Sequence, residues 1–206
     1  MIRIGVLLSG RGSNLQALLD ACSEGRIDGQ IVVAVSDKAD AFGLERARQA
    51  GVKAIFIDPA AYETKNAYNG ALAETLKENN VDLVCLAGYM RLVRKPMLQA
   101  FAGRIMNIHP ALLPSFKGLD AQRQALEYGV KVAGCTVHFV TEGMDEGPII
   151  LQAAVPVLED DTEQTLSERI LHEEHRIYPE AVQLYAQGRL TLEGRRVRIQ
   201  RPEGSP

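Results

Sequence analysis

The chain opens with IRIGVLLSGRGSNLQALLDAC at residues 2–22. A short apolar run at residues 2–8 ends in Ser-Gly-Arg-Gly, which predicts a buried strand followed by a turn. Four residues then follow at the i, i+3, i+4, i+7 spacing of an amphipathic helix: Leu15, Leu18, Leu19 and Cys22. A strand, a glycine-rich turn and a helix in this order begin a strand–helix–strand unit, the building block of parallel sheets.

The same alternation continues beyond residue 22. Further strands are predicted at residues 31–36, 53–57, 83–87 and 104–108. Helices are predicted between them at about 40–50 and 63–79. Short connections between strands and helices favour parallel pairing with helices on both faces. We therefore expect an α/β fold built on a single open, mostly parallel, doubly wound sheet of Rossmann-like type.

The C-terminal half is less regular. β-rich runs at residues 131–140 and 148–157 are joined by a short turn, which predicts an antiparallel addition to the sheet. Asp161 with Gln164 three residues later has the pattern of a capping box that opens a helix. Pro179 is expected to kink or interrupt that helix. Residues 189–201 alternate weakly around a Glu-Gly turn, which predicts a hairpin.

Composition excludes several classes of protein. The 206 residues carry 23 basic and 26 acidic side chains, a net charge of −3, so neither nucleic acid nor an anionic membrane is expected as a partner. No apolar run approaches the length of a membrane span. The cysteines, at positions 22, 85 and 135, are odd in number and far apart, which favours a reducing cytoplasm over a disulfide framework. We expect a cytoplasmic monomer or homodimer.

The turn at residues 10–14, Gly-Arg-Gly-Ser-Asn, is the first candidate binding site. Backbone N–H groups at a helix N-terminus bind anions, and the helix dipole favours negative charge there. Ser13 and Asn14 add side-chain donors. These features predict a site for a phosphate monoester. A plain turn with a Ser or Asn cap is the alternative without function.

A dinucleotide site is a second alternative for this turn. Gly10 and Gly12 fit the glycine pattern of such sites, and Asp37 follows the second strand, where a ribose-binding acid belongs. The third glycine of that pattern would fall at position 15, which is Leu15. A single phosphate therefore fits the turn better than a pyrophosphate does.

The second candidate site is Asn-Ile-His-Pro at residues 107–110, where a strand of the predicted sheet ends. Strand alternation puts Asn107 and His109 on the same side, and Pro110 keeps His109 extended. An amide donor beside an imidazole suits an oxyanion and a proton transfer. A purely structural histidine is the alternative.

An acidic turn at residues 141–148, TEGMDEGP, is the third candidate. One of its carboxylates beside His109 would hold the ring and favour its charged form. The alternative is a solvated acidic turn. A metal site of His109, His138 and Asp145 has no supporting ligand spacing, so no metal is expected.

Taken together, these segments resemble the folate-dependent phosphoribosylglycinamide formyltransferase family. The matching stretches run in family order from residue 5 to about residue 190: SGRGSNLQAL, SDKADAFGLERA, LAGYMRL, GRIMNIHPALLPSFKG, TVHFVTEGMDEGPII and EEHRIYP. The resemblance implies transfer of a formyl group from 10-formyltetrahydrofolate, a cosubstrate, to the amine of 5-phosphoribosylglycinamide in purine biosynthesis. It implies small-molecule substrates only.

The resemblance also implies roles for individual residues. The catalytic trio would be Asn107, His109 and Asp145. The ribonucleotide substrate would be bound by Gly12, Ser13, Asn14 and Glu174. The folate would be bound by Lys65, Met90, Arg91, Leu92, Val93, Asn107, Val140, Thr141, Glu142, Gly143 and Met144.

Two residues depart from the family pattern. Lys65 stands where some relatives carry an arginine, and Leu171 where some carry a polar residue.

The resemblance and the crowded His-Pro-Ala-Leu-Leu-Pro path also predict a cis peptide bond between Leu113 and Pro114.

We expect one formyltransferase domain over residues 1–206. Its parts would be a phosphate-binding half at 1–100, a catalytic and folate-binding half at 101–188, and a hairpin with a tail at 189–206. Methionyl-tRNA formyltransferase, which would need a further C-terminal domain and a basic RNA surface, and formyltetrahydrofolate hydrolase, which would need an N-terminal regulatory domain, are the alternatives within the superfamily. A non-catalytic nucleotide-binding module is the alternative outside it.

Overall fold

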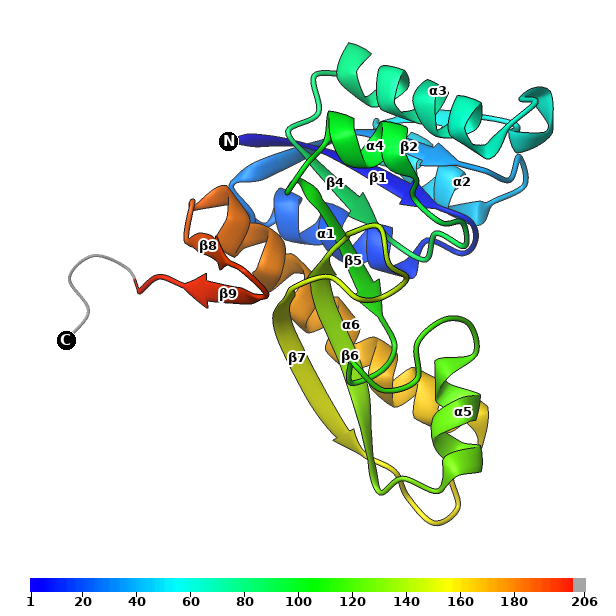
Figure 1. Ribbon diagram of the computed structural model, residues 1–206, viewed down its shortest axis with the longest axis vertical. Helices are drawn as coiled ribbons and strands as arrows, with labels where there is room; N and C mark the ends of the chain where they lie inside the picture. The colour runs from blue at the N-terminus through cyan, green and yellow to red at the C-terminus, as the bar shows by residue number, and fades with distance from the viewer. Residues whose placement is uncertain (202–206) are drawn as a thin grey trace. The chain divides into compact units, whose positions relative to one another are not determined.

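The computed structural model describes residues 1–201 (Figure 1). The chain divides into two compact units, one over Met1–Asn107 and one that begins at Ile108. We describe each unit by itself.

The first unit is built on parallel strands. They are β1 (Ile2–Leu8), β2 (Gly29–Ser36), β3 (Lys53–Phe56), β4 (Leu83–Leu86) and β5 (Ile105–His109), which runs on into the second unit. β1 pairs in parallel with both β2 and β4, and the outer pairs are also parallel. The apolar run that predicted β1 is buried from Ile4 onward, because both faces of this strand are covered.

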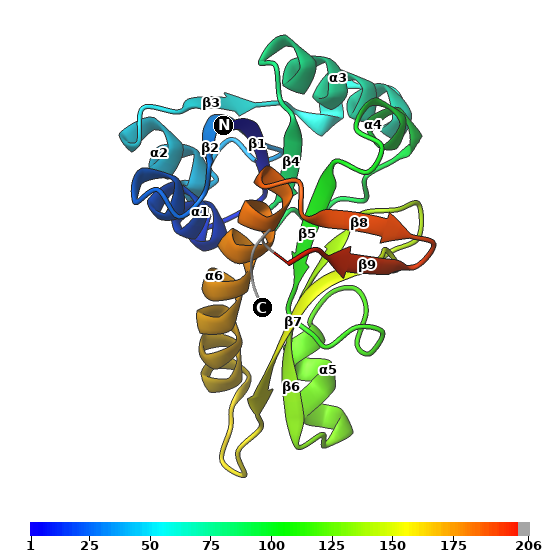
Figure 2. The ribbon, with the colours of Figure 1, turned by 90° about the vertical axis from the view of Figure 1, so that its left-hand side faces the viewer.

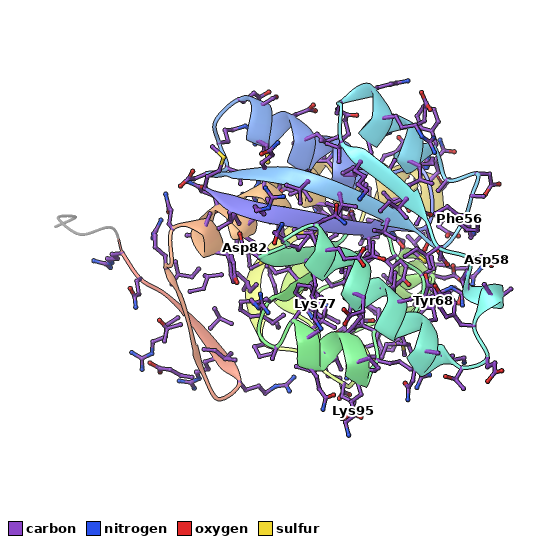
Figure 3. The ribbon with its side chains drawn as sticks, turned by 90° about the horizontal axis from the view of Figure 1, so that it is seen from above. Phe56, Asp58, Tyr68, Lys77, Asp82 and Lys95 are labelled. Atoms are coloured by element: carbon purple, nitrogen blue, oxygen red, sulfur yellow. The ribbon has the colours of Figure 1, made fainter. Side chains whose placement is uncertain are left out.

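Helices cover both faces of this parallel sheet. They are α1 (Ser13–Ser23), α2 (Phe42–Gln49), α3 (Lys65–Glu78), α4 (Lys95–Ala100) and the short 3₁₀ turn η1 (Pro59–Ala61). Figure 2 shows α1 and α2 on one face and α3 and α4 on the other, and Figure 3 shows the same layers from above. In α1, Leu15 and Leu18 are fully buried, as their spacing predicts.

The second unit contains α5 (Ala121–Tyr128), β6 (Val132–Phe139), β7 (Ile149–Pro156), α6 (Glu163–Ala186), β8 (Leu190–Glu193) and β9 (Arg196–Ile199). β6 and β7 pair antiparallel, with a register shift between Val137 and His138. The long helix α6 packs on both strands. β8 and β9 form the predicted hairpin as a separate small sheet.

Within residues 1–201, the main sheet has the strand order β3-β2-β1-β4-β5-β6-β7. This order confirms the predicted open, mostly parallel sheet with an antiparallel addition in the C-terminal half. The predicted cis bond between Leu113 and Pro114 is also confirmed. No helix of this described part is long and apolar enough to cross a membrane.

One expectation about α6 is wrong. The capping box is formed by Thr162 and Thr165, one residue beyond the predicted pair, with Thr162 Oγ1 accepting a hydrogen bond from Thr165 N at 3.2 Å. Pro179 lies inside α6 and does not interrupt it. Side chains on both sides of Pro179 are buried, and this packing offsets the backbone hydrogen bond that a proline removes.

Candidate active site

The glycine loop, residues 10–14, connects β1 to α1. Gly12 is the N-cap of α1, with φ 71° and ψ 31°, a left-handed conformation that favours glycine. Because glycine has no side chain, nothing at this position covers the N–H groups of the first helical turn. Ser13 and Asn14 form the first turn itself. The loop therefore presents a helix N-terminus, backbone donors and two polar side chains, as an anion site requires.

Two residues of helix α2 donate hydrogen bonds to the glycine loop. Gly43 N donates to Gly10 O at 3.0 Å, and Arg46 Nε donates to Arg11 O at 2.9 Å. A Cβ on Gly12 would lie 2.6 Å from the Cα of Gly43, so the two glycines let these segments touch. These hydrogen bonds to the carbonyls of residues 10 and 11 stabilise the conformation of the loop.

The β4–α4 loop, residues 87–94, contains four of the predicted folate-binding residues. Met90 and Leu92 are 58% and 52% exposed, whereas Val93 is buried. Arg91 forms an ion pair with Asp37, in which Nε lies 2.7 Å from Oδ2. Lys65, the other predicted cation, is exposed at the start of α3.

Asn107 and His109 both lie in β5, where strand alternation points them to the same side. Asn107 is partly exposed, and the His109 side chain is 6% exposed. His109 Nε2 lies 2.9 Å from Phe116 O. A carbonyl oxygen only accepts hydrogen bonds, so Nε2 carries the proton there.

The other nitrogen of His109 faces Asp145. The distance from Nδ1 to Asp145 Oδ2 is 3.5 Å, and the Asp145 side chain is 12% exposed. Both ring nitrogens thus face acceptors, an arrangement that a protonated imidazolium satisfies. Gly118 N donates to Asp145 Oδ2 at 2.9 Å and holds the carboxylate in place.

A second histidine lies on the opposite side of Asp145. His138 Nε2 is 3.7 Å from Asp145 Oδ1, and its Nδ1 lies 2.9 Å from Phe139 O and therefore donates to it. Burial lowers the pKa of His138, which favours the neutral form of this ring. The sequence analysis considered His138 only in the metal site that it set aside.

The acidic turn is shaped so that Asp145 turns inward. Phe139 N donates to Pro148 O at 2.9 Å and closes the base of the turn. A Cβ on Gly147 would lie 1.6 Å from Phe139 O, so only glycine fits this crossing. Glu142 is exposed, and Glu146 pairs with Lys117 at 2.8 Å. Of the three acids, Asp145 alone has its carboxylate against His109 in the described structure.

The other predicted site residues are placed as follows. Glu174 lies on α6 and is 7% exposed. The turn residues predicted to bind folate, Val140 to Met144, follow directly on β6, and Met144 is 50% exposed. Within residues 1–201, no group of three or more His, Cys, Asp or Glu side chains could hold a metal ion.

Four contacts were not foreseen from the sequence. Phe116 and Gly118 act through backbone groups, and such groups have no residue signature. Asp37 and Arg46 lie in the stretch SDKADAFGLERA, whose match to the family carried no assigned role. The position of Asp37 directly after a strand was noticed in the sequence, but as the mark of a ribose-binding acid and not of a partner for Arg91.

A family model described as formyl transferase matches residues 2–182. Phosphoribosylglycinamide formyltransferase from Escherichia coli (strain K12) is 46% identical over 191 residues, which cover 93% of this chain and 90% of the relative. The chain belongs to the phosphoribosylglycinamide formyltransferase family. The resemblance seen in the sequence is thereby confirmed.

Further comparisons agree with this family. The crystal structure of glycinamide ribonucleotide transformylase 1 from Symbiobacterium toebii has a TM-score of 0.97 and 71% identity, and it covers 98% of this chain and 95% of that one. The human trifunctional purine biosynthetic protein adenosine-3 is 50% identical over 190 residues. That match covers 92% of this chain but only 19% of the human protein.

Proposed function

We propose that this chain transfers the formyl group of 10-formyltetrahydrofolate to the amine of 5-phosphoribosylglycinamide in purine biosynthesis. The observation that carries the proposal is His109, whose two ring nitrogens face Phe116 O and the carboxylate of Asp145. An imidazolium held in this way can stabilise a nearby negative oxygen through its charge. Membership in the formyl transferase family supports this reaction class.

The glycine loop is proposed to bind the phosphate of the ribonucleotide. The first-turn amides of α1 carry the positive end of the helix dipole, and Ser13 and Asn14 supply further polar groups. Glu174 is proposed as a contact to the glycinamide part, where a carboxylate attracts an amine. Its low exposure strengthens this attraction, because the local dielectric is lower than that of water.

The formyl donor is proposed to bind at the β4–α4 loop and at residues 140–144. Met90, Leu92 and Met144 expose apolar side chains suited to a flat ring system. Lys65 is proposed as a cation for a carboxylate of the donor. As a point charge, it lacks the bidentate geometry of an arginine.

The reaction needs a nucleophile, a place for negative charge and a proton path. The amine nitrogen forms a bond to the formyl carbon, whose oxygen then becomes negative. The Asn107 amide would donate a hydrogen bond to that oxygen, and the positive charge of the His109 imidazolium would stabilise it. Asp145 would stabilise the charged ring. When the bond from the carbon to the donor nitrogen breaks, the amine loses a proton and the donor nitrogen gains one, and Asp145 would help to relay it through water.

An acceptor comparison tests this proposal. Purified protein is incubated with 10-formyltetrahydrofolate and either 5-phosphoribosylglycinamide, methionyl-tRNA or water alone. We expect formyl transfer to the ribonucleotide only, detected by loss of the donor and by mass of the product. Transfer to tRNA, or donor hydrolysis at the same rate without an acceptor, would contradict it.

The partners in this proposal are small molecules, and no step calls for a metal ion. We propose a cytoplasmic location as well. Three cysteines without disulfide bonds at positions 22, 85 and 135 are in keeping with a reducing compartment.

A further inference from the structure

The β4–α4 loop is held by buried polar side chains from three different elements. Ser9 Oγ accepts from Met90 N at 2.9 Å, and Asn69 Oδ1 accepts from Arg94 N at 2.8 Å. Asp37, directly after β2, accepts from the Arg91 side chain. All three residues are less than 9% exposed. Burying a polar side chain costs free energy unless the side chain is hydrogen-bonded. Here all three buried side chains form hydrogen bonds to one loop.

The exposed side chains of this loop indicate why so many hydrogen bonds hold its backbone. Met90 and Leu92 point apolar groups to solvent, although their backbone is fixed. Fixing a loop before a ligand arrives lowers the entropic cost of binding. Asn69 also donates through Nδ2 to Lys65 O at 2.9 Å, so it connects the loop to the other proposed donor-binding residue.

Asp37 is the residue of this framework with a full charge. Its side chain is 4% exposed, compared with 44% for its partner Arg91. Oδ2 accepts from Arg91 Nε at 2.7 Å, but Oδ1 is buried without a hydrogen-bond partner in the described structure. A buried carboxylate with only one of its oxygens hydrogen-bonded contributes little to the stability of the fold. Its presence is better explained by its effect on the position of Arg91.

Arg91 is fixed on a second side by an aromatic ring. Its guanidinium carbon lies 5.8 Å from the centre of the Tyr68 ring, within the range of a cation–π contact. Tyr68 sits in the first turn of α3, as labelled in Figure 3, and its hydroxyl accepts from Tyr89 at 3.1 Å. Asp37 and Tyr68 thus contact the guanidinium of Arg91 on two sides, while 44% of its side chain is exposed.

We propose that Asp37 is a positioning residue for the formyl donor. Acting through Arg91, it holds the β4–α4 loop in the conformation that binds the folate. This rests on the proposed function, which assigns the donor to this loop. The sequence analysis had considered Asp37 as the ribose-binding acid of a dinucleotide site, but its carboxylate is turned to Arg91 instead.

The first test is the variant Asp37→Asn, with Asp40→Asn as its matched control. Asparagine keeps the shape and one acceptor oxygen but removes the charge. Asp40 is an exposed acid of the same connection, so its variant removes the same charge without touching Arg91. We expect KM for 10-formyltetrahydrofolate to rise about tenfold in Asp37→Asn only, with KM for the ribonucleotide nearly unchanged. An unchanged donor KM, or equal rises in both KM values, would overturn the proposal.

The second test asks whether Asp37 acts through Arg91. In Arg91→Met the carboxylate stays buried and loses its partner. We therefore expect Asp37→Asn to cause no further rise in donor KM on this background, or to lower it. If the two substitutions instead multiply their separate effects, Asp37 acts independently of Arg91 and the proposal is wrong.

The third test observes the loop directly. The chain has no tryptophan, so Leu92→Trp introduces a single fluorophore into the loop. Adding Asp37→Asn should lower its fluorescence anisotropy and increase quenching by acrylamide, whereas adding Asp40→Asn should do neither. Equal anisotropy in all three proteins would count against the proposal. This readout needs no activity, so an unreactive wild type would refute the proposed function and leave the loop test standing.

Discussion

Replacing Asp145 with asparagine tests the central charge of the proposed site. The substitution keeps the size of the side chain and an oxygen for the Gly118 N–H, but it removes the negative charge 3.5 Å from His109 Nδ1. At that distance, two unit charges attract by roughly 5 kcal/mol with an effective dielectric constant of about 20. Part of this attraction is spent on desolvating the pair.

The expected loss of activity follows from how much one such interaction contributes to the rate. One charge-stabilising or proton-transferring partner typically contributes about 10²–10⁴-fold in rate, and the lower end of this range lies well within the attraction between Asp145 and His109. We therefore expect kcat to fall at least about 100-fold in Asp145→Asn, equivalent to roughly 2.7 kcal/mol. KM for the ribonucleotide should change little, because its phosphate is assigned to the glycine loop.

Steady-state kinetics with two matched controls decide the assignment. Glu142→Gln and Glu146→Gln remove charges from the same turn, and each should cost far less. Glu142 is exposed, and Glu146 is already paired with Lys117, which holds the pKa of Glu146 below its usual range. Near-native kcat in Asp145→Asn, or a larger loss in Glu142→Gln, would refute the reasoning.

Three other predictions concern the glycine loop, His138 and the start of α6. Gly12→Ala puts a Cβ 2.6 Å from Gly43 Cα at a φ of +71°, so KM for the ribonucleotide should rise at least about tenfold while donor KM is nearly unchanged. A titration with inorganic phosphate should weaken in parallel, and an unchanged affinity would exclude the loop as the phosphate site. Burial lowers the pKa of His138, so below its unfolded pKa of about 6.5 the unfolded chain binds a proton that the folded chain does not. Stability from this group is therefore lost as the pH falls through that value, by at most about 1.4 kcal/mol per pH unit. Urea unfolding at pH 7, 6 and 5 should show a shallower decline in His138→Gln than in the wild type, and identical slopes would show that His138 is not buried neutral. Thr162→Ala removes the N-cap of α6 and should lower the free energy of unfolding by about 1 kcal/mol, whereas Thr141→Ala, on an exposed loop, should not.

The alternation of strands and helices could be predicted because it depends on local periodicity. Each strand of the first unit is an apolar run closed by a turn, and no competing pattern overlaps it. Helix α4 was missed because six residues that include a proline are too few to show a helical period. The capping box was placed one residue early because Asp161 and Thr162 are both good N-caps, and only the backbone decides between them.

The candidate site was predictable to a different degree. The glycine loop follows from its place between a strand and a helix. The pairing of His109 with Asp145 was expected, and the two side chains are indeed in contact. The backbone partners at Phe116 and Gly118 could not be predicted, because any residue has a carbonyl and nearly any has an N–H. Phe116 also has a φ of 49°, which is rare for an aromatic residue and leaves no trace in a sequence pattern.

The stretch SDKADAFGLERA at residues 36–47 has no group that reacts in the proposed mechanism, yet it touches both proposed binding loops. At its start, Asp37 holds Arg91 of the β4–α4 loop. Further along, Gly43 and Arg46 bond the carbonyls of the glycine loop. One stretch, from the end of β2 into α2, therefore sets the geometry of the loop assigned to the donor and of the loop assigned to the phosphate. Because both loops depend on where α2 starts, an insertion in this stretch would disturb the binding of both substrates, whereas a single side-chain change affects one.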